Sequence, residues 1–340
     1  LNPTVQALLA GNAVIIKPSE ATPFSSQLVE KLFLQSGLPE GLVQVLLGDG
    51  QTGEELIDSS IDKVSFTGSV ATGKKVAIRC SEKLIPFTLE LGGNDAMIIC
   101  DDADIEKAVS GAFIGSCMNS GQYCCGTERI YITEKNHDEF VEKLSAQALL
   151  LNQNGKEDAD VGSIVWDKQL KIIESHVQEA LKDGAILHTG GRKNPSLTGL
   201  YYEPTVLSNV NHSMRIMNEE TFGPIACVQK VKDEEEALRL ANDSKYGLNG
   251  NIWTENKKKG LKLANQLNTG AVSVNDMAMS YGINELPFGG VKNSGLGSVN
   301  GVEGLKGYCH PMPVIMERFA KGPVSSYPYT DKTVKDMQGA

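Results

Sequence analysis

The sequence predicts an α/β protein made of two successive α/β domains and a C-terminal tail. Short apolar runs rich in β-branched residues, typical of buried strands, alternate with longer amphipathic runs typical of helices. The 340 residues are enough for two domains of ordinary size. A hydrophobic content of 41% and a charged content of 22% are those of an ordinary globular protein.

The first domain is expected to cover residues 1–92. Its strands are predicted at residues 12–17, 43–47, 63–67 and 86–91. Its helices are predicted at residues 23–35, 52–59 and 69–82. Thr52 is the expected cap of the second helix, because Glu55 follows three residues later. Strands and helices that alternate through short links are typical of one parallel sheet covered by helices on both faces.

The second domain is expected to cover residues 93–295. Its strands are predicted at residues 95–100, 129–133, 205–210, 225–231, 250–253 and 271–275. Its helices are predicted at residues 104–119, 138–151, 168–182, 234–243 and 256–267. Residues 296–340 are rich in glycine and proline, so we expect an irregular tail that docks on the first domain or on a neighbouring subunit.

Charge and cysteine content narrow the classes of function. A net charge of −10 and a pI of about 5.1 argue against binding to nucleic acid or to an anionic membrane surface. The seven cysteines form no C-x-x-C pair, which favours a reducing compartment such as the cytoplasm over a disulfide framework or a zinc site. None of the apolar runs is long enough to predict a membrane span.

The turn at residues 118–126 holds the first candidate for chemistry. Cys124 lies there after Ser-Gly-Gln, between a helix-like run and a strand-like run, where a partly exposed thiolate can act as a nucleophile. Its alternative is an inert, buried small residue, the commoner state of an intracellular cysteine. Glu90 lies among apolar residues and before two glycines, a poor place for a solvated carboxylate and a suitable one for a base.

Two further motifs lie where an open α/β sheet binds ligands. The glycine-containing turn at residues 68–73 joins a strand to a helix, whose N-terminus can bind phosphate. Lys17 and Glu20 follow the first predicted strand, where they can bind the hydroxyls of a ribose. The structural alternatives are a tight turn and a solvated pair of charged side chains.

Two later loops are ambiguous by themselves. The segment 219–224 places Glu220 and Phe222 before a strand, and its structural alternative is an acidic turn with a core phenylalanine. The segment 286–295 packs glycines around Phe288, which is typical of a pocket-lining loop or of a structural loop.

Taken in order, these segments resemble the aldehyde dehydrogenase superfamily. The resemblance runs from residue 1 to about residue 320, and each motif is modest alone but specific in this sequence order. The motifs are GNAVIIKPSEATP, FTGSVATG, LELGG, NSGQYCC, EETFGP and LPFGGVKNSG. The resemblance implies a Rossmann-type cofactor domain followed by an α/β catalytic domain. The final motif is somewhat similar to the branch that acts on aromatic and fatty aldehydes.

The resemblance also implies roles for particular residues. Cys124 matches the catalytic thiol, and Glu90 matches the general base. Lys17 and Glu20 match the residues that hold the adenosine ribose, and Gly68 matches the pyrophosphate turn together with the serine that follows it.

On the nicotinamide side, the resemblance places Leu91 and Gly92 near the ring. Glu220 matches the carboxylate that binds the nicotinamide ribose, and Phe222 lies beside the ring. Ser69, which follows Gly68, belongs to the turn that matches the pyrophosphate-binding position. Phe288 matches a position in the wall of the substrate pocket, and no metal is implied.

The resemblance predicts oxidation of an aldehyde to a carboxylic acid with NAD(P)⁺. The Cys124 thiolate attacks the carbonyl to form a thiohemiacetal, and Glu90 activates the water that hydrolyses the later thioester. Two alternatives stay open: transfer of the acyl group to coenzyme A, and a non-catalytic structural protein on the same fold.

The N-terminal region departs from the family pattern. In the family, a Trp-Asn motif whose asparagine supplies half of the oxyanion hole precedes the Gly-Asn-x-Val strand, and Asn2 does not match that asparagine. We therefore expect a piece of a longer chain. Glu20 favours NAD over NADP, because a carboxylate repels a 2′-phosphate. Relatives indicate a homodimer or homotetramer, and a cytoplasmic location is expected unless an organelle-targeting segment precedes Leu1.

Overall fold

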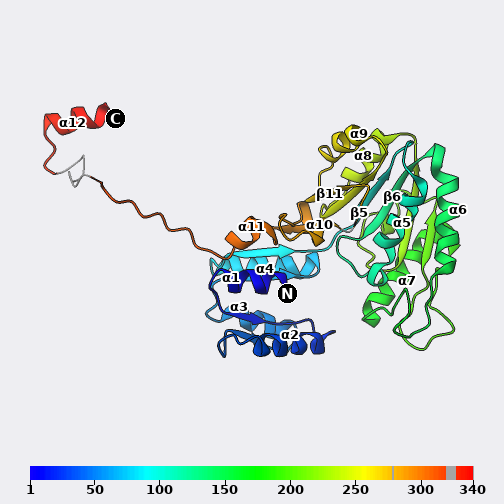
Figure 1. Ribbon diagram of the computed structural model, residues 1–340, viewed down its shortest axis with the longest axis horizontal. Coiled ribbons are helices and arrows are strands. Elements are labelled where there is room, and N and C mark those ends of the chain that lie inside the picture. The colour runs from blue at the N-terminus through cyan, green and yellow to red at the C-terminus, as the bar shows by residue number, and fades with distance from the viewer. Residues whose placement is uncertain (278, 319–326, 340) are drawn as a thin grey trace. The chain divides into compact units, whose positions relative to one another are not determined.

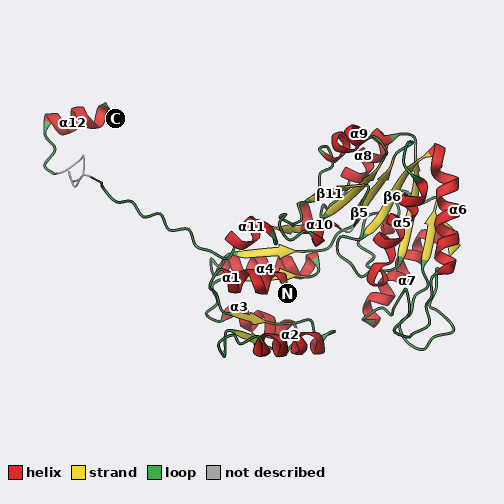
Figure 2. Ribbon diagram, viewed as in Figure 1, coloured by secondary structure: helices red, strands yellow, loops and turns green. Residues whose placement is uncertain are grey.

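The computed structural model describes residues 1–277, 279–318 and 327–339, and the chain forms two compact units, Leu1–Tyr308 and Cys309–Ala340 (Figure 1). The first unit carries almost all of the strands and helices, which follow one another along the chain as Figure 2 shows. Part of the predicted tail, residues 319–326 and 340, lies outside the described residues.

A seven-stranded sheet forms the centre of the region after residue 92. Its strands lie in the order β11-β10-β5-β6-β9-β8-β7, and every neighbouring pair is parallel except β7 with β8. Their bounds are β5 Asp95–Ile99, β6 Thr127–Thr133, β7 Ile186–Thr189, β8 Thr205–Ser208, β9 Ile225–Val231, β10 Asn249–Trp253 and β11 Ala271–Val274.

Helices cover both faces of this sheet, which is the layered arrangement that the sequence pattern predicts (Figure 1). The helices are α5 Ile105–Cys117, α6 Glu134–Leu150, α7 Asp167–Lys182, α8 Glu234–Asn242 and α9 Lys257–Ala264. Successive residues of β5 point to opposite faces: Met97 packs with α5 and α6, whereas Ile98 packs with α7, α8 and α9. Both side chains are fully buried, so β5 is a central strand of a two-sided core.

The strands before residue 92 form two small sheets, so the prediction of one parallel sheet in this region is wrong. β1 Val14–Ile16 pairs in parallel with β2 Val43–Val45. β3 Val64–Thr67 pairs in parallel with β4 Phe87–Glu90, and β12 Gly295–Leu296 joins β4 from the other side in an antiparallel direction. The two sheets stay separate because no described strand hydrogen-bonds to strands of both.

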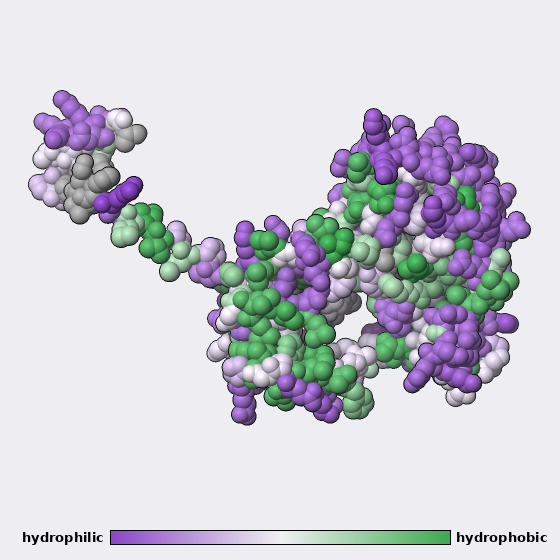
Figure 3. All heavy atoms as spheres, viewed as in Figure 1, coloured by the Kyte–Doolittle hydropathy of each residue, from purple (hydrophilic) through white to green (hydrophobic). Residues whose placement is uncertain are grey.

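The helices of this region are short and lie largely on the surface. They are α1 Asn2–Leu9, α2 Pro23–Gln35, α3 Gly50–Asp58 and α4 Val70–Glu82. Helix α2 buries none of its residues, and Phe24 and Leu28 are 79% and 59% exposed. Figure 3 shows many apolar side chains on the surface of the part of the molecule that holds α1–α4.

The cap of α3 differs from the prediction. Asp49 is the N-cap, and its carboxylate accepts hydrogen bonds from the backbone N–H groups of Gln51 and Thr52. Thr52 itself lies inside the first turn, because the helix begins two residues before it. Aspartate is as good a cap as threonine, and here it lies nearer the free N–H groups.

The predicted tail is only partly irregular. Within the tail, Gly301–Lys306 form α11 and Asp331–Gln338 form α12. A short helix, α10 Met279–Gly282, lies before the tail. Helix α11 packs against α1, and the Asn2 side chain donates a hydrogen bond to Asn300 Oδ1 at 3.0 Å. Within the described part of the chain, none of the helices combines the length and the apolar character that crossing a bilayer requires.

Candidate active site

The cysteine turn begins where α5 ends. A short 3₁₀ turn over Met118–Gly121 follows the helix, and Asn119, Ser120 and Gly121 all have positive φ angles of 51°, 60° and 71°. A Cβ atom on Gly121 would lie 2.0 Å from the carbonyl oxygen of Gly223, so only glycine allows the turn to pack there. The turn therefore fixes the direction in which the chain enters the cysteine pair before β6.

The two adjacent cysteines lie in different environments. Cys124 is half-buried, whereas Cys125 is 1% exposed and packs with Leu248, Phe288 and Val299. A hydrogen bond from the Cys125 side chain, together with backbone N–H groups, lowers the pKa of Cys124 against the opposing effect of burial. The same interaction and burial raise the pKa of Cys125. Cys124, the more accessible sulfur, is therefore the more acidic thiol of the pair.

Glu90 is the last residue of β4 and is held on both sides by other strands. It pairs with Thr67 of β3 and with Gly295 of β12. Its backbone carbonyl accepts a hydrogen bond from the N–H of Gly68 at 3.1 Å. Glu90 is 8% exposed, and its Oε1 atom lacks a hydrogen-bond partner among the described residues.

The structure brings Glu90 within electrostatic reach of Cys124. Burial raises the pKa of Glu90 to about 8, and the negative charge of the Cys124 thiolate adds to that rise. The thiolate also raises the pKa of Glu220 and of Tyr281, which lie far from it along the chain. Cys124, Glu90 and Glu220 therefore surround one site.

Glu220 lies directly over the two glycines that follow β4. A Cβ atom on Gly92 would lie 2.1 Å from Oε2 of Glu220, and the N–H of Gly93 donates a hydrogen bond to Oε1 at 3.2 Å. A Cβ atom on Gly93 would also lie 2.5 Å from the carbonyl oxygen of Cys124. The glycine pair thus lets a carboxylate and the cysteine turn approach one backbone segment from two sides.

Two further predicted site residues form a pair at the carboxyl end of β1. The ammonium of Lys17 donates a hydrogen bond to the carbonyl of Gly48 at 2.9 Å and lies 3.8 Å from Glu20 Oε2. Lys17 is 19% exposed and Glu20 is 51% exposed, so the carboxylate is the more solvent-accessible of the two charged groups.

The predicted phosphate-binding turn lies between β3 and α4. Ser69 is the N-cap of this helix, where its hydroxyl accepts a hydrogen bond from Thr72 N–H at 3.3 Å. Gly68 and Ser69 are both exposed. Leu91, in contrast, is 5% exposed and packs on Gly73 of α4, where a Cβ atom would lie 2.4 Å from the leucine side chain.

The two predicted aromatic site residues differ in their surroundings. Phe222 is half-buried and has a positive φ of 52°, in the same turn as Glu220. Phe288 is 1% exposed and contacts the ring of Tyr281 edge-on, with ring centroids 5.1 Å apart. Phe288 thus lies in the layer beneath the cysteine pair, and Tyr281 is the more exposed of these two rings.

Sequence reasoning missed Glu128, Asn94 and Asp95. Glu128, near the start of β6, accepts a hydrogen bond from the Asn94 side chain at 2.9 Å. Asp95 is 2% exposed, and burial raises its pKa well above the usual range. The available signal was the pair Glu128-Arg129 at the head of an otherwise apolar strand, because buried charges require partners.

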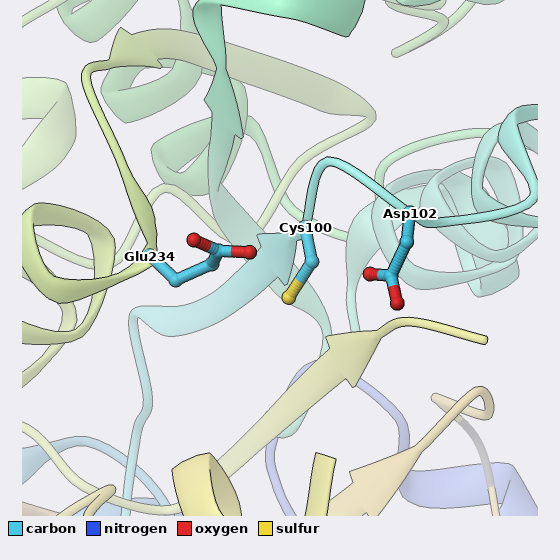
Figure 4. A group of neighbouring side chains, drawn as sticks. All are labelled: Cys100, Asp102 and Glu234. Atoms are coloured by element: carbon cyan, nitrogen blue, oxygen red, sulfur yellow. The ribbon is translucent and has the colours of Figure 1, made fainter. Parts of the chain in front are cut away.

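A separate group of side chains lies at the end of β5 and is shown in Figure 4. The sulfur of Cys100 and the carboxylate oxygens of Asp102 and Glu234 all lie within 4.8 Å of one another. The ammonium of Lys259 lies 2.6 Å from Asp102 Oδ1 and 2.9 Å from Glu234 Oε1. Lys259 supplies the positive charge that these carboxylates need, so the group is a partly buried ion-pair network.

Comparisons with known proteins show the family of this chain. The model of the aldehyde dehydrogenase family matches residues 1–314, and the chain belongs to this family. The chain is 41% identical over 340 residues to a 4,4′-diapolycopene aldehyde oxidase from a Methylomonas species, across 99% of this chain and 63% of that protein.

Solved structures show the same fold. The chain is similar to a Mycobacterium tuberculosis aldehyde dehydrogenase complexed with NAD⁺, with a TM-score of 0.87 and 37% identity over 90% of this chain and 64% of the other. It is also similar to a Staphylococcus aureus betaine aldehyde dehydrogenase in complex with NAD⁺, with a TM-score of 0.84 and 36% identity over 89% of this chain and 61% of the other. The chain spans about three fifths of the length of the curated relatives it matches.

Proposed function

We propose that this protein oxidises an aldehyde to a carboxylic acid with NAD(P)⁺ and uses Cys124 as its nucleophile and Glu90 as its general base. The observation that carries the proposal is that the half-buried Cys124 and the buried Glu90 border one site, where the cysteine turn packs on the glycine pair after β4. The raised pKa of Glu90, caused by burial and by the nearby Cys124, agrees with this arrangement. A nucleophile and a base with pKa values moved toward neutrality are the usual components of covalent catalysis.

The residues around Gly92 fit a dinucleotide. Gly68 and Ser69 open α4, whose free N–H groups suit a pyrophosphate, and Lys17 with Glu20 suits the adenosine ribose. At Gly92 a Cβ atom would lie 2.1 Å from Glu220 Oε2, so glycine lets the carboxylate assigned to the ribose approach this backbone closely. We assign Leu91 and Phe222 to the ring and Glu220 to its ribose. When bound, the nicotinamide accepts a hydride.

Cys124 and Glu90 perform the covalent chemistry. The Cys124 sulfur forms a bond to the carbonyl carbon, and the π electrons of the C=O bond move to the oxygen, which gives a thiohemiacetal. After oxidation to the thioester, Glu90 takes a proton from water, and the hydroxide equivalent attacks the same carbon. The C–S bond then breaks, and the electron pair returns to sulfur as the carboxylic acid leaves.

Cys124→Ser tests the assignment. Serine lacks a thiolate at neutral pH, so we expect a loss of at least about 10³-fold in NAD(P)H formation with an aldehyde substrate, measured at 340 nm. Cys309→Ser, which changes an exposed cysteine outside the first unit, is the matched control and is expected to keep full activity. Near-normal turnover of Cys124→Ser would end the assignment.

The substrate and the assembly belong to the same proposal. We propose that the substrate is an apolar aldehyde, because the final motif resembles the branch that acts on aromatic and fatty aldehydes. Phe288 belongs to the layer that supports the wall of the proposed substrate pocket.

We propose that the protein forms a homodimer or a homotetramer. The exposed apolar side chains on α2 support this assembly.

A further inference from the structure

The turn that carries Glu220 is held by another buried carboxylate. Glu128 accepts a hydrogen bond from Phe222 N–H at 2.8 Å, and both of its oxygens lie 2.9 Å from Thr221 N. Its Oε2 atom also accepts a hydrogen bond from the Asn94 side chain at 2.9 Å. All of these partners are hydrogen-bond donors, so both oxygens of Glu128 act as acceptors.

These bonds join three parts of the chain that are distant in sequence. Glu128 lies in β6, Thr221 and Phe222 lie in the turn before β9, and Asn94 follows the glycine pair after β4. Asn94 also donates a hydrogen bond to the carbonyl of Glu219 at 3.3 Å, so the turn is held at both of its ends. The backbone on either side of Glu220 therefore cannot move without breaking hydrogen bonds to the Glu128 carboxyl group or to the Asn94 amide.

We propose that Glu128 is a positioning residue for cofactor binding, holding the 219–222 turn so that the Glu220 carboxylate stays over Gly92. The inference rests on the proposed function, because it gives Glu220 the cofactor-binding role assigned above. Glu128 touches neither reacting atom, and it acts through the backbone of the two residues that follow Glu220.

Glu128 has a second effect on Glu220, through its charge. Burial, followed by the charge of Glu128, raises the pKa of Glu220 to about 8, and the N–H of Gly93 opposes this rise. The other groups that face Glu220 are the Cys124 thiolate and Tyr246, which lies against its backbone. Of these groups, Glu128 makes the largest contribution from a charge.

The charge of Glu128 depends on its own surroundings. Burial raises its pKa, whereas the N–H groups of Phe222 and Thr221, the amide of Asn94 and the guanidinium of Arg129 lower it. Arg129 is 2% exposed and donates to the backbone carbonyls of Asn94 and Leu240. Burial is the largest of these effects, so the pKa of Glu128 is raised overall, and the surrounding donors partly offset that rise.

The consequence is a pH dependence of NAD⁺ affinity. An ionised Glu220 accepts hydrogen bonds from ribose hydroxyls more strongly than a neutral one, so NAD⁺ affinity rises as the pH rises through about 8. Removing the charge of Glu128 lowers the pKa of Glu220. The midpoint of that rise then moves to lower pH.

Glu128→Gln separates charge from position. Its Oε1 atom still accepts from Thr221 and Phe222. Its new amide can donate to Asn94 Oδ1 only if the Asn94 amide turns over, which removes the Asn94 bond to the Glu219 carbonyl. NAD⁺ dissociation constants are measured by titration calorimetry from pH 6 to pH 9. We expect the midpoint to move down by about one pH unit, as for removal of one nearby charge. Glu142→Gln, an exposed carboxylate on α6, is the matched control and keeps the wild-type midpoint.

Glu128→Ala tests the positioning itself. This variant removes the acceptor of two backbone N–H groups, and we expect the dissociation constant for NAD⁺ at pH 9 to rise by about tenfold or more. The rate of Cys124 alkylation by iodoacetamide is expected to stay within about twofold of the wild-type rate, which shows that the cysteine turn is intact. At pH 9, Glu128→Gln is expected to bind NAD⁺ as the wild type does.

The outcomes distinguish the inference from the function on which it rests. A wild-type protein that binds NAD⁺, combined with a Glu128→Gln variant whose midpoint is unchanged, overturns the inference and leaves the proposed function standing. Equal affinity of Glu128→Ala and wild type at pH 9 does the same. A wild-type protein that does not bind NAD⁺ overturns both.

Discussion

At the scale of single residues, Glu90 combines two requirements that oppose each other. Its burial excludes bulk water from the site, but burial also raises its pKa to about 8, so much of it is protonated at neutral pH. A general base works only in its ionised form. The proposed role of Glu90 as a general base therefore requires an ionised form that burial destabilises in the folded protein.

We expect the pH dependence of thioester hydrolysis to report this pKa. In the wild type, the hydrolysis rate should rise with pH and level off above about 8, because the ionised fraction of Glu90 rises through that value. Glu90→Gln should still release a first equivalent of NAD(P)H but hydrolyse the thioester at least about 10²-fold more slowly. Stopped-flow absorbance at 340 nm measures both phases. A variant with wild-type steady-state turnover and no burst contradicts the assignment.

The same substitution has a predictable effect on stability. The folded-state pKa of Glu90 is raised above the unfolded value of 4.5, so the folded state holds the extra proton between these pH values and loses stability as the pH rises through the window. Glu90→Gln removes the titration. We expect its melting temperature to exceed that of the wild type by a few degrees at pH 9 and to match it closely at pH 5, measured by calorimetry.

At the scale of elements, the short link after β4 brings the site together. Gly92 and Gly93 pass between the Glu220 carboxylate on one side and the Cys124 carbonyl on the other. The backbone N–H of Leu91 donates to the carbonyl of Ser294 at 2.9 Å, which anchors the same link to the segment before β12. Three motifs from distant parts of the sequence thus meet at one stretch of backbone.

Gly92→Ala tests the importance of this link. The new methyl group would lie 2.1 Å from Glu220 Oε2, so the carboxylate must move. We expect the KM for NAD⁺ to rise about tenfold or more, while Cys124 keeps its alkylation rate. Gly50→Ala is the matched control, because a Cβ atom at Gly50 meets nothing within 4 Å. An unchanged KM in Gly92→Ala would show that Glu220 does not bind the cofactor.

At the scale of the whole molecule, we expect the residues after the first strand to influence the choice of cofactor. Lys17 and Glu20 follow β1, and their charged groups lie 3.8 Å apart. A carboxylate at this place accepts ribose hydroxyls and repels a 2′-phosphate. We therefore expect a higher kcat/KM with NAD⁺ than with NADP⁺, and we expect Glu20→Gln to reduce that ratio by up to about tenfold because Glu20 is exposed. Steady-state kinetics with the two cofactors measure the ratio.

The order of strands and helices could be predicted from the sequence because each signal is local. The apolar run around Ile98 and the helix preceding the cysteine turn are periodic within a few residues, and the structure confirms both. The two-residue strand β12 could not be predicted, because a pair of residues such as Gly295 and Leu296 carries no periodicity and becomes a strand only by pairing with β4. The strand β7 was missed because its residues are largely exposed and lack a clear alternation.

By itself, the sequence determined the α/β class, the cysteine turn and the motifs that identify the aldehyde dehydrogenase family. Only the tertiary structure decided which side chains lie together, such as Glu128 with the turn of Glu220 and Phe288 with the cysteine pair. It also decided that the first strands divide into two sheets. The physical reason is range. Helix periodicity and turn chemistry act over a few residues. The contacts of Glu128 with Thr221 and of Gly92 with Glu220 join segments more than 90 residues apart and depend on the register of the sheets.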